Sequence, residues 1–138
     1  MDLSAIEAKM AERDWQAAAD ASRELLRSQP VNAKLHGYLG WSLMQIGDFA
    51  AAVDSLKRAV NLEPRLLPAG RCLAQSLVQQ NRYQEAWDIV TEYLKQAPND
   101  RMLIGLRDFL HERVKHRGER WEINQRVEAK VRMAGDDD

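Results

Sequence analysis

The sequence predicts an all-α protein, a solenoid of stacked antiparallel helix pairs. The first observation is an internal repeat with a period of about 34 residues, which places Pro30, Pro64 and Pro98 at one repeat position and Trp15, Phe49 and Tyr83 at another. Alanines at 18, 52 and 86 and aspartates at 20, 54 and 88 follow the same spacing. The second observation is composition, because only 4 prolines and 7 glycines interrupt a chain rich in helix-forming residues.

Each expected helix has local start and stop signals. We expect helices near residues 2–12, 15–28, 33–46, 49–62, 67–80, 83–96, 100–116 and 119–133. Gly47 and Asn81 tolerate the left-handed conformation that closes a helix before a short turn. The repeated prolines end every second helix, and Pro68 suits the first turn of a helix, where an N–H is dispensable. Leu39, Leu43, Val53, Leu56 and Val60 are expected to form the buried seam of the central pair.

The repeat resembles the tetratricopeptide repeat over about residues 3–98. The residues that match its pattern W-x2-L-G-x2-Y, A-x3-F, P are His36, Leu39, Gly40, Leu43, Ala52, Leu56 and Pro64 in one copy, and Gly70, Leu73, Ala74, Leu77, Ala86, Val90 and Pro98 in the next. The first copy is weaker, with Lys9 at an apolar position. The resemblance implies a right-handed superhelix whose concave face is lined by the first helix of each pair.

The chain after Pro98 departs from the repeat. Asn99 or Asp100 can cap a helix whose apolar stripe is Leu103, Leu106, Leu110 and Val114. We therefore expect one domain over residues 1–134, with repeats at about 1–32, 33–66 and 67–100 and capping helices at about 100–116 and 119–133. The tail, residues 135–138, is expected to be disordered.

Charge and composition argue against several classes of protein. The 20 basic and 21 acidic residues give a net charge of −1, whereas nucleic-acid binders and proteins of anionic membranes usually carry a basic surplus. No apolar run approaches the ~20 residues that span a bilayer, and the start has no secretory signal. We expect a soluble, cytoplasmic protein that binds neither nucleic acid nor membrane.

The sequence contains no catalytic constellation, and we predict no enzyme activity, metal site or cofactor. His111 and His116 are five residues apart and so point to different faces of a helix, which does not suit shared metal ligation. His36 occupies a core position and is expected to be a packed histidine. Cys72, the single cysteine, has no neighbouring histidine and is expected to be a structural thiol.

The concave face is the best candidate for a binding site. Projection of the first helices onto this face places Lys34, Gly37, Trp41 and Gln45 in one unit and Arg71, Gln75 and Gln79 in the next. An exposed Trp41 beside side-chain amides would suit an extended peptide; alternatively, Trp41 packs against a neighbouring helix. Some family members clamp a peptide's terminal carboxylate, but Leu3, Glu7, Tyr38, Pro68 and Cys72 occupy the matching positions and cannot supply that charge.

Two functions of different class follow. The first is a non-catalytic module that binds a peptide or helix of a partner protein, as an adaptor or a small chaperone. Size and repeat number also resemble the cytoplasmic chaperones of bacterial type III secretion. The alternative is a self-associating scaffold, a homodimer for example, that uses Trp121, Ile123 and Val127 of the last helix.

Overall fold

The computed structural model describes residues 2–114, and this part of the chain is helical throughout with short connections. The helices are α1 (Leu3–Ala11), α2 (Trp15–Ser28), α3 (Ala33–Ile46), α4 (Phe49–Leu62), α5 (Leu67–Gln79) and α6 (Tyr83–Gln96), followed by a helical segment over residues 101–114. The expected all-α solenoid is confirmed, and the bounds of α1 to α6 agree with the expected ranges to within one residue.

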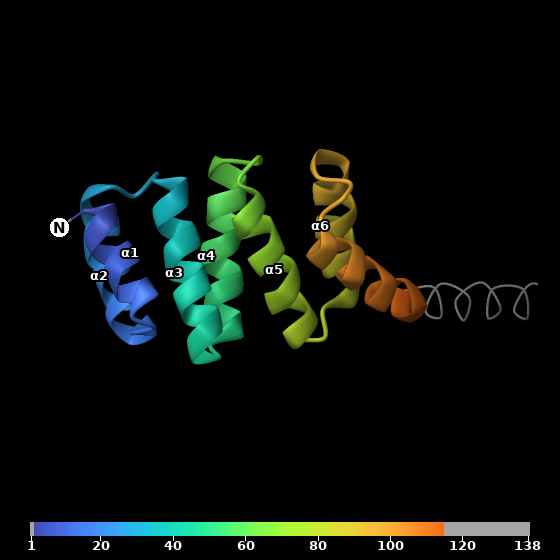
Figure 1. Ribbon diagram of the computed structural model, residues 1–138, viewed down its shortest axis with the longest axis horizontal. Coiled ribbons are helices and arrows are strands. Elements are labelled where there is room, and N and C mark those ends of the chain that lie inside the picture. The colour runs from blue at the N-terminus through green and yellow to red at the C-terminus, as the bar shows by residue number, and fades with distance from the viewer. Residues whose placement is uncertain (1, 115–138) are drawn as a thin grey trace, which may run out of the picture.

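The helices stand side by side in antiparallel pairs (Figure 1). Helix α3 lies close to both α1 and α5, so the first helices of the pairs form a continuous row. The second helices are further apart, and the side chains of Lys57 on α4 and Glu85 on α6 form an ion pair across this wider space. The row of α1, α3 and α5 is therefore the inner, concave side of the stack.

Side-chain caps fix where most helices begin. Asp2, Asp14, Asn32 and Asp48 each accept a hydrogen bond from the backbone N–H three residues later, at 3.1–3.2 Å. These bonds satisfy N–H groups that have no partner within the first turn of a helix. Helix α5 has no such cap, and Pro68 lies in its first turn as expected.

The turns within the pairs repeat the same backbone conformation. Arg13, Gly47 and Asn81, which occupy the same position of successive repeats, all have positive φ values of 59°, 96° and 59°. This confirms the expected role of Gly47 and Asn81. Arg13 adopts the left-handed conformation without the freedom of glycine, so the repeat geometry is imposed there against local preference.

The core requires close approach between the two helices of a pair. Ala18, Ala52 and Ala86 are fully buried, which confirms the small-residue position of the repeat. A Cβ atom on Gly40 would lie 2.4 Å from Cγ of Leu56, so only glycine fits at this crossing of α3 and α4. Leu39, Leu43, Val53 and Leu56 of the expected seam are buried, and Val60 is partly buried against them.

The second and third pairs fill the same position with side chains of opposite size. In the third pair, a Cβ on Gly70 would lie 2.6 Å from the ring of Tyr93, which is buried. The corresponding positions one repeat earlier hold a large His36 and a small Ala59, both buried. The bulky group thus comes from the first helix in one pair and from the second helix in the next.

Residues 101–114 cover the open end of α5 and α6. Leu103 and Leu110 are fully buried and Leu106 packs beside them, as the apolar stripe predicts. Asp100 is the cap, since its carboxylate accepts from the N–H of Leu103 at 3.0 Å. Phe109 contacts the ring of Tyr83 edge-on, with 6.1 Å between the ring centroids.

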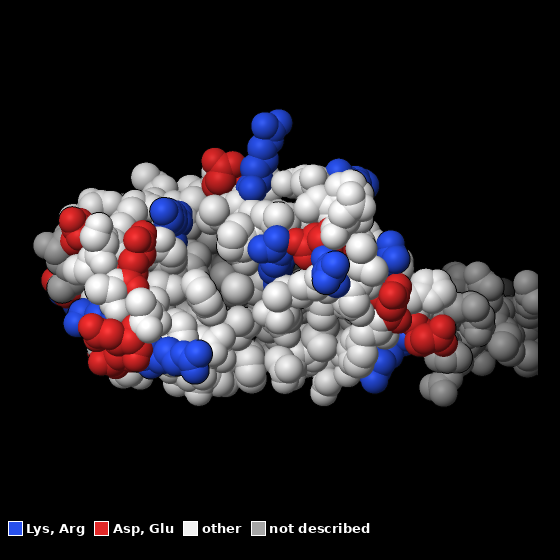
Figure 2. Space-filling model, viewed as in Figure 1, with Lys and Arg blue, Asp and Glu red and all other residues white. Residues whose placement is uncertain are grey.

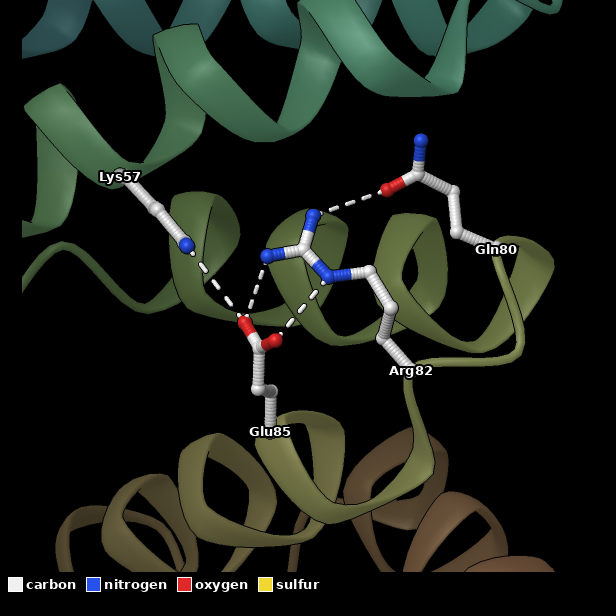
Figure 3. A network of polar contacts seen from close by, with 4 residues as sticks. All are labelled: Lys57, Gln80, Arg82 and Glu85. Carbon is white, nitrogen blue, oxygen red and sulfur yellow. Dashed lines mark hydrogen bonds and ion pairs between the residues drawn. The ribbon is translucent and has the colours of Figure 1, made fainter.

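A polar network joins neighbouring pairs on the outer side of the stack (Figure 3). Arg82 donates to both carboxylate oxygens of Glu85, at 3.1 and 2.7 Å, and to the side-chain oxygen of Gln80 at 3.0 Å. Lys57 of α4 lies 3.4 Å from the same Glu85 carboxylate. The two cations lower the pKa of Glu85, with the hydrogen bonds from Arg82 as the largest cause.

No helix among residues 2–114 is both long and apolar enough to cross a lipid bilayer.

His36 is 6% exposed, and its Nε2 lies 2.8 Å from the carbonyl oxygen of Pro30, so it is a packed histidine as expected.

Candidate functional site

The concave face carries an apolar pocket between α3 and α5, which we call the α3–α5 pocket. Its volume is about 240 Å³, and its exposed lining consists almost wholly of apolar atoms. It is lined by Lys34, Gly37, Tyr38, Trp41, Leu66, Pro68, Ala69 and Cys72. Figure 2 shows a largely uncharged stretch in the lower middle of this view, with charged groups above it and to its sides.

The one charged residue of the pocket lining is paired. Lys34 Nζ lies 3.8 Å from the Glu7 carboxylate of α1 and 5.7 Å from the centroid of the Tyr38 ring. The Tyr38 hydroxyl donates a hydrogen bond of 2.6 Å to the same carboxylate. Burial, and then the hydrogen bond and the charge of Glu7, raise the pKa of Tyr38, so its hydroxyl remains protonated. These contacts tie α1 to α3 at the edge of the pocket.

Cys72 contributes a neutral thiol to the pocket wall. Burial raises its pKa to about 11, against a smaller lowering effect of the charge on Arg71. A thiol with a raised pKa forms little thiolate at neutral pH and is a poor nucleophile. This agrees with the expected structural role of Cys72.

Trp41 combines the two arrangements that the sequence left open. Its ring packs against Trp15 of α2, with centroids 5.8 Å apart and planes tilted by 40°. It is nevertheless 41% exposed, and it lines both the α3–α5 pocket and a second hollow formed with Met10, Ala11, Arg13, Trp15 and Gln45. Trp15 therefore holds one face of Trp41, while the remaining surface is available to a ligand.

A third hollow continues the path along α3. It is lined by Met44, Gln45, Phe49, Gln75, Val78, Gln79 and Leu106. Because Trp41 belongs to the first two hollows and Gln45 to the last two, the three are neighbours along one face. We call this run of three hollows the groove; it begins with apolar walls and ends beside three glutamine side chains.

The structure assigns Arg71 a different position from its neighbours in the predicted site. It lines none of the three hollows described above and instead binds Asp100, with Nε 2.7 Å from the carboxylate and a second bond from its terminal nitrogen. Asp100 also caps the segment 101–114. The hydrogen bonds from Arg71, followed by that from Leu103, lower the pKa of Asp100. Arg71 thus attaches the C-terminal segment to α5.

Sequence reasoning missed part of the pocket. It named Tyr38, Pro68 and Cys72 for other reasons and did not place them in a pocket. It used Trp15 only as a repeat position and assigned no role to Leu66 or Ala69. The signal was present, since residues 34, 37, 38 and 41 share one face of α3, and residues 68, 69 and 72 share one face of α5.

Other predicted sites have different outcomes. Within residues 2–114, no group of three or more histidine, cysteine or acidic side chains could hold a metal ion. The ring of His111 packs against that of Trp87, with centroids 6.0 Å apart and planes tilted by 48°. Trp121, Ile123 and Val127, His116, the helix expected at 119–133 and the tail lie outside the described residues, so self-association through them stays a prediction.

Comparisons with known proteins agree on the architecture. The family model described as tetratricopeptide repeat matches residues 3–70. The first TPR domain of Spaghetti (RPAP3), bound to the HSP90 peptide SRMEEVD, has a TM-score of 0.77 at 15% identity, over 81% of this chain and 89% of that one. The second TPR domain of human RPAP3, in complex with the HSP70 peptide SGPTIEEVD, gives 0.74 at 13% identity, over 78% and 90%.

A third solved structure, MamA, has a TM-score of 0.76 at 22% identity and covers 83% of this chain and 66% of its own. A search of curated protein sequences gave no match. Sequence identities this low support the fold and not a shared ligand. The repeat pattern, the stacked helix pairs and the family model together place this chain in the tetratricopeptide-repeat family.

Proposed function

We propose that this chain is a non-catalytic protein-interaction module that holds a peptide or helix of a partner protein in the groove along α3. It would act in the cytoplasm as an adaptor or a small chaperone. The observation that carries the proposal is the exposed face of Trp41 where two of the hollows meet, because partly exposed tryptophans in concave sites are frequent anchors of protein interfaces.

The remaining features of the groove support the same function. Gln45, Gln75 and Gln79 offer amide donors and acceptors at one end of it, which suits the backbone of an extended segment. Two solved structures of similar fold, the first and second TPR domains of RPAP3, hold short peptides of HSP90 and HSP70. A role as a type III secretion chaperone is a narrower form of this proposal and rests only on size and repeat number.

Affinity capture from the native cell tests the proposal with Trp41→Ala and a matched control. Leu62 of α4 is 43% exposed, nearly the same as Trp41, but it lies outside the groove. We expect Trp41→Ala to lose the captured partner and Leu62→Ala to retain it. Equal capture by the wild type and both variants would refute the groove as the binding site.

Folding must be measured beside capture, because Trp41 also packs on Trp15. The aromatic pair contributes about 0.5–1.5 kcal/mol beyond the area that its rings bury, so Trp41→Ala is expected to lower the free energy of unfolding by more than this amount. If Trp41→Ala unfolds the domain, its loss of capture says nothing for the groove, and the proposal loses its anchor.

A further inference from the structure

We propose that the partner segment inserts an uncharged apolar side chain into the α3–α5 pocket and that the pocket rejects carboxylates. This inference rests on the proposed function and goes further, because it names the chemistry of the partner at one point of the groove.

The size of the pocket suits one large side chain. Its volume is about 240 Å³. A cavity of about 150 Å³ lined by aliphatic and aromatic groups is already large enough to hold benzene. The α3–α5 pocket can therefore take a leucine, methionine or phenylalanine side chain from a partner, with one side left open for the partner's backbone.

The lining gives an apolar group favourable surroundings. Carbon atoms of Tyr38, Leu66 and Pro68 face the space, and the Cys72 thiol is neutral. An apolar side chain that moves from water into such a pocket gains free energy in proportion to the area it buries. A charged group gains nothing comparable and loses its hydration.

The nearby cations are already paired. Lys34 lies 3.8 Å from the carboxylate of Glu7, and Arg71, from the helix that forms the other wall, is bound to Asp100. A ligand carboxylate would have to compete with Glu7 for Lys34 and would also meet the negative charge of Glu7. Repulsion of this kind produces selectivity without any new attractive contact.

Structures of the same fold hold ligands of different chemistry. The peptides SRMEEVD and SGPTIEEVD both end in Glu-Glu-Val-Asp, so three of their last four residues are acidic. The α3–α5 pocket of the present chain is unsuited to such a sequence. The shared tetrapeptide EEVD is therefore a useful negative probe, because it lacks a leucine, methionine or phenylalanine and its binding would contradict the proposal directly.

Gly37 offers a way to fill the pocket from within. A Cβ atom at Gly37 would meet Leu66 Cδ2 at 3.8 Å and Ala69 Cβ at 3.9 Å, which are ordinary contacts inside the pocket lining. Gly37→Leu should therefore occupy the pocket without disturbing the backbone. The matched control is Gly105→Leu, since Gly105 is also helical and has no atom within 4 Å of an added Cβ.

The experiment selects binders from a phage library of random dodecapeptides that are fused at both ends, so that no free carboxylate is present. We expect the enriched peptides to share a large apolar residue at one position. Gly37→Leu should weaken their binding roughly 10- to 100-fold, the equivalent of one lost apolar side chain, and Gly105→Leu should leave it unchanged. Excess EEVD tetrapeptide should not compete.

Cys72 gives a second, independent readout, because it is the single cysteine of the chain and lines the pocket. The neutral reagent methyl methanethiosulfonate should label Cys72 more slowly once a selected peptide is bound. Unchanged labelling in the complex would place the peptide elsewhere and overturn the inference.

The outcomes separate the inference from the proposed function. Enrichment of acidic peptides, competition by EEVD or full binding to Gly37→Leu would overturn the apolar pocket. If Trp41→Ala still abolished binding, the groove itself would stand. A library that yields no binder would contradict both proposals.

Discussion

The substitution Gly40→Ala tests the close packing of α3 on α4. The added Cβ would lie 2.4, 2.6 and 3.3 Å from three carbon atoms of Leu56. Leu56 is fully buried and cannot move into solvent. An extra methyl group in a packed core costs about 1–3 kcal/mol, and overlaps this short favour the upper end. Alanine stabilises a helix by about 1 kcal/mol relative to glycine, so Gly40→Ala should lower the free energy of unfolding by about 2 kcal/mol in total.

Gly37→Ala, one turn earlier on the same helix, is the internal comparison. Its added Cβ meets no atom closer than 3.8 Å, so the substitution adds no overlap. The higher helix propensity of alanine should then raise the free energy of unfolding by up to about 1 kcal/mol. The two variants should thus differ by about 3 kcal/mol although the substitution is the same. For a domain of this size, such a difference corresponds to a shift in melting temperature of about 10 °C.

Urea unfolding followed by far-ultraviolet circular dichroism measures this difference. The double variant Gly40→Ala, Leu56→Ala adds a second check, because the loss of the large side chain removes the overlap. We expect the double variant to be more stable than the sum of the two single losses predicts. Equal midpoints for Gly40→Ala and Gly37→Ala would refute the reasoning.

Three further predictions concern charge and turns. The pKa of Asp100 is lowered in the folded state, so its charge stabilises the fold above the unfolded pKa of about 3.9, and this stability is lost as pH falls through the lower folded pKa. The variant Asp100→Asn keeps a capping side chain but has no charge. Its urea midpoint should therefore lie below that of the wild type at pH 7, and the two midpoints should converge in acid. Gly47→Ala places a side chain at a φ of 96° and should lower the free energy of unfolding by about 1–2 kcal/mol, and with it the melting temperature. Arg13→Gly should raise the melting temperature slightly. The reverse order of the two melting temperatures would contradict the turn analysis. Glu85→Gln should cost less than about 1 kcal/mol in urea unfolding, and the loss should shrink at high salt; a larger, salt-independent loss would argue against a surface ion network.

The repeat made most of the fold predictable. Its constant spacing fixed helix lengths, turns and the small-residue positions, since each is set by local backbone geometry. The weak first copy still folds as a helix, because Ile6 and Met10 supply the buried face that Lys9 does not. Whether Trp41 was exposed or packed depended on Trp15, which belongs to the preceding helix pair, and helical spacing carries no information on such a contact.

Long-range pairs also decided which predicted site residues lie in the groove. Lys34, Gly37, Trp41 and Gln45 follow one face of α3, and the helical period identifies them without further help. Arg71 was assigned to the groove by the same period, but its side chain is long enough to reach Asp100, 29 residues later. The partner of a charged side chain depends on the length of the side chain as well as on the helix face that carries it, and a single sequence does not show which partner it will bind.

The opposite sizes at Gly70 with Tyr93 and at His36 with Ala59 have a consequence for assembly of the stack. Helices of equal length and similar pattern could otherwise exchange partners during folding. If α3 paired with α6, His36 would face Tyr93, two rings in a space built for one; if α5 paired with α4, Gly70 would face Ala59 and leave a void. The shape of the core therefore matches α3 and α5 each to its own second helix.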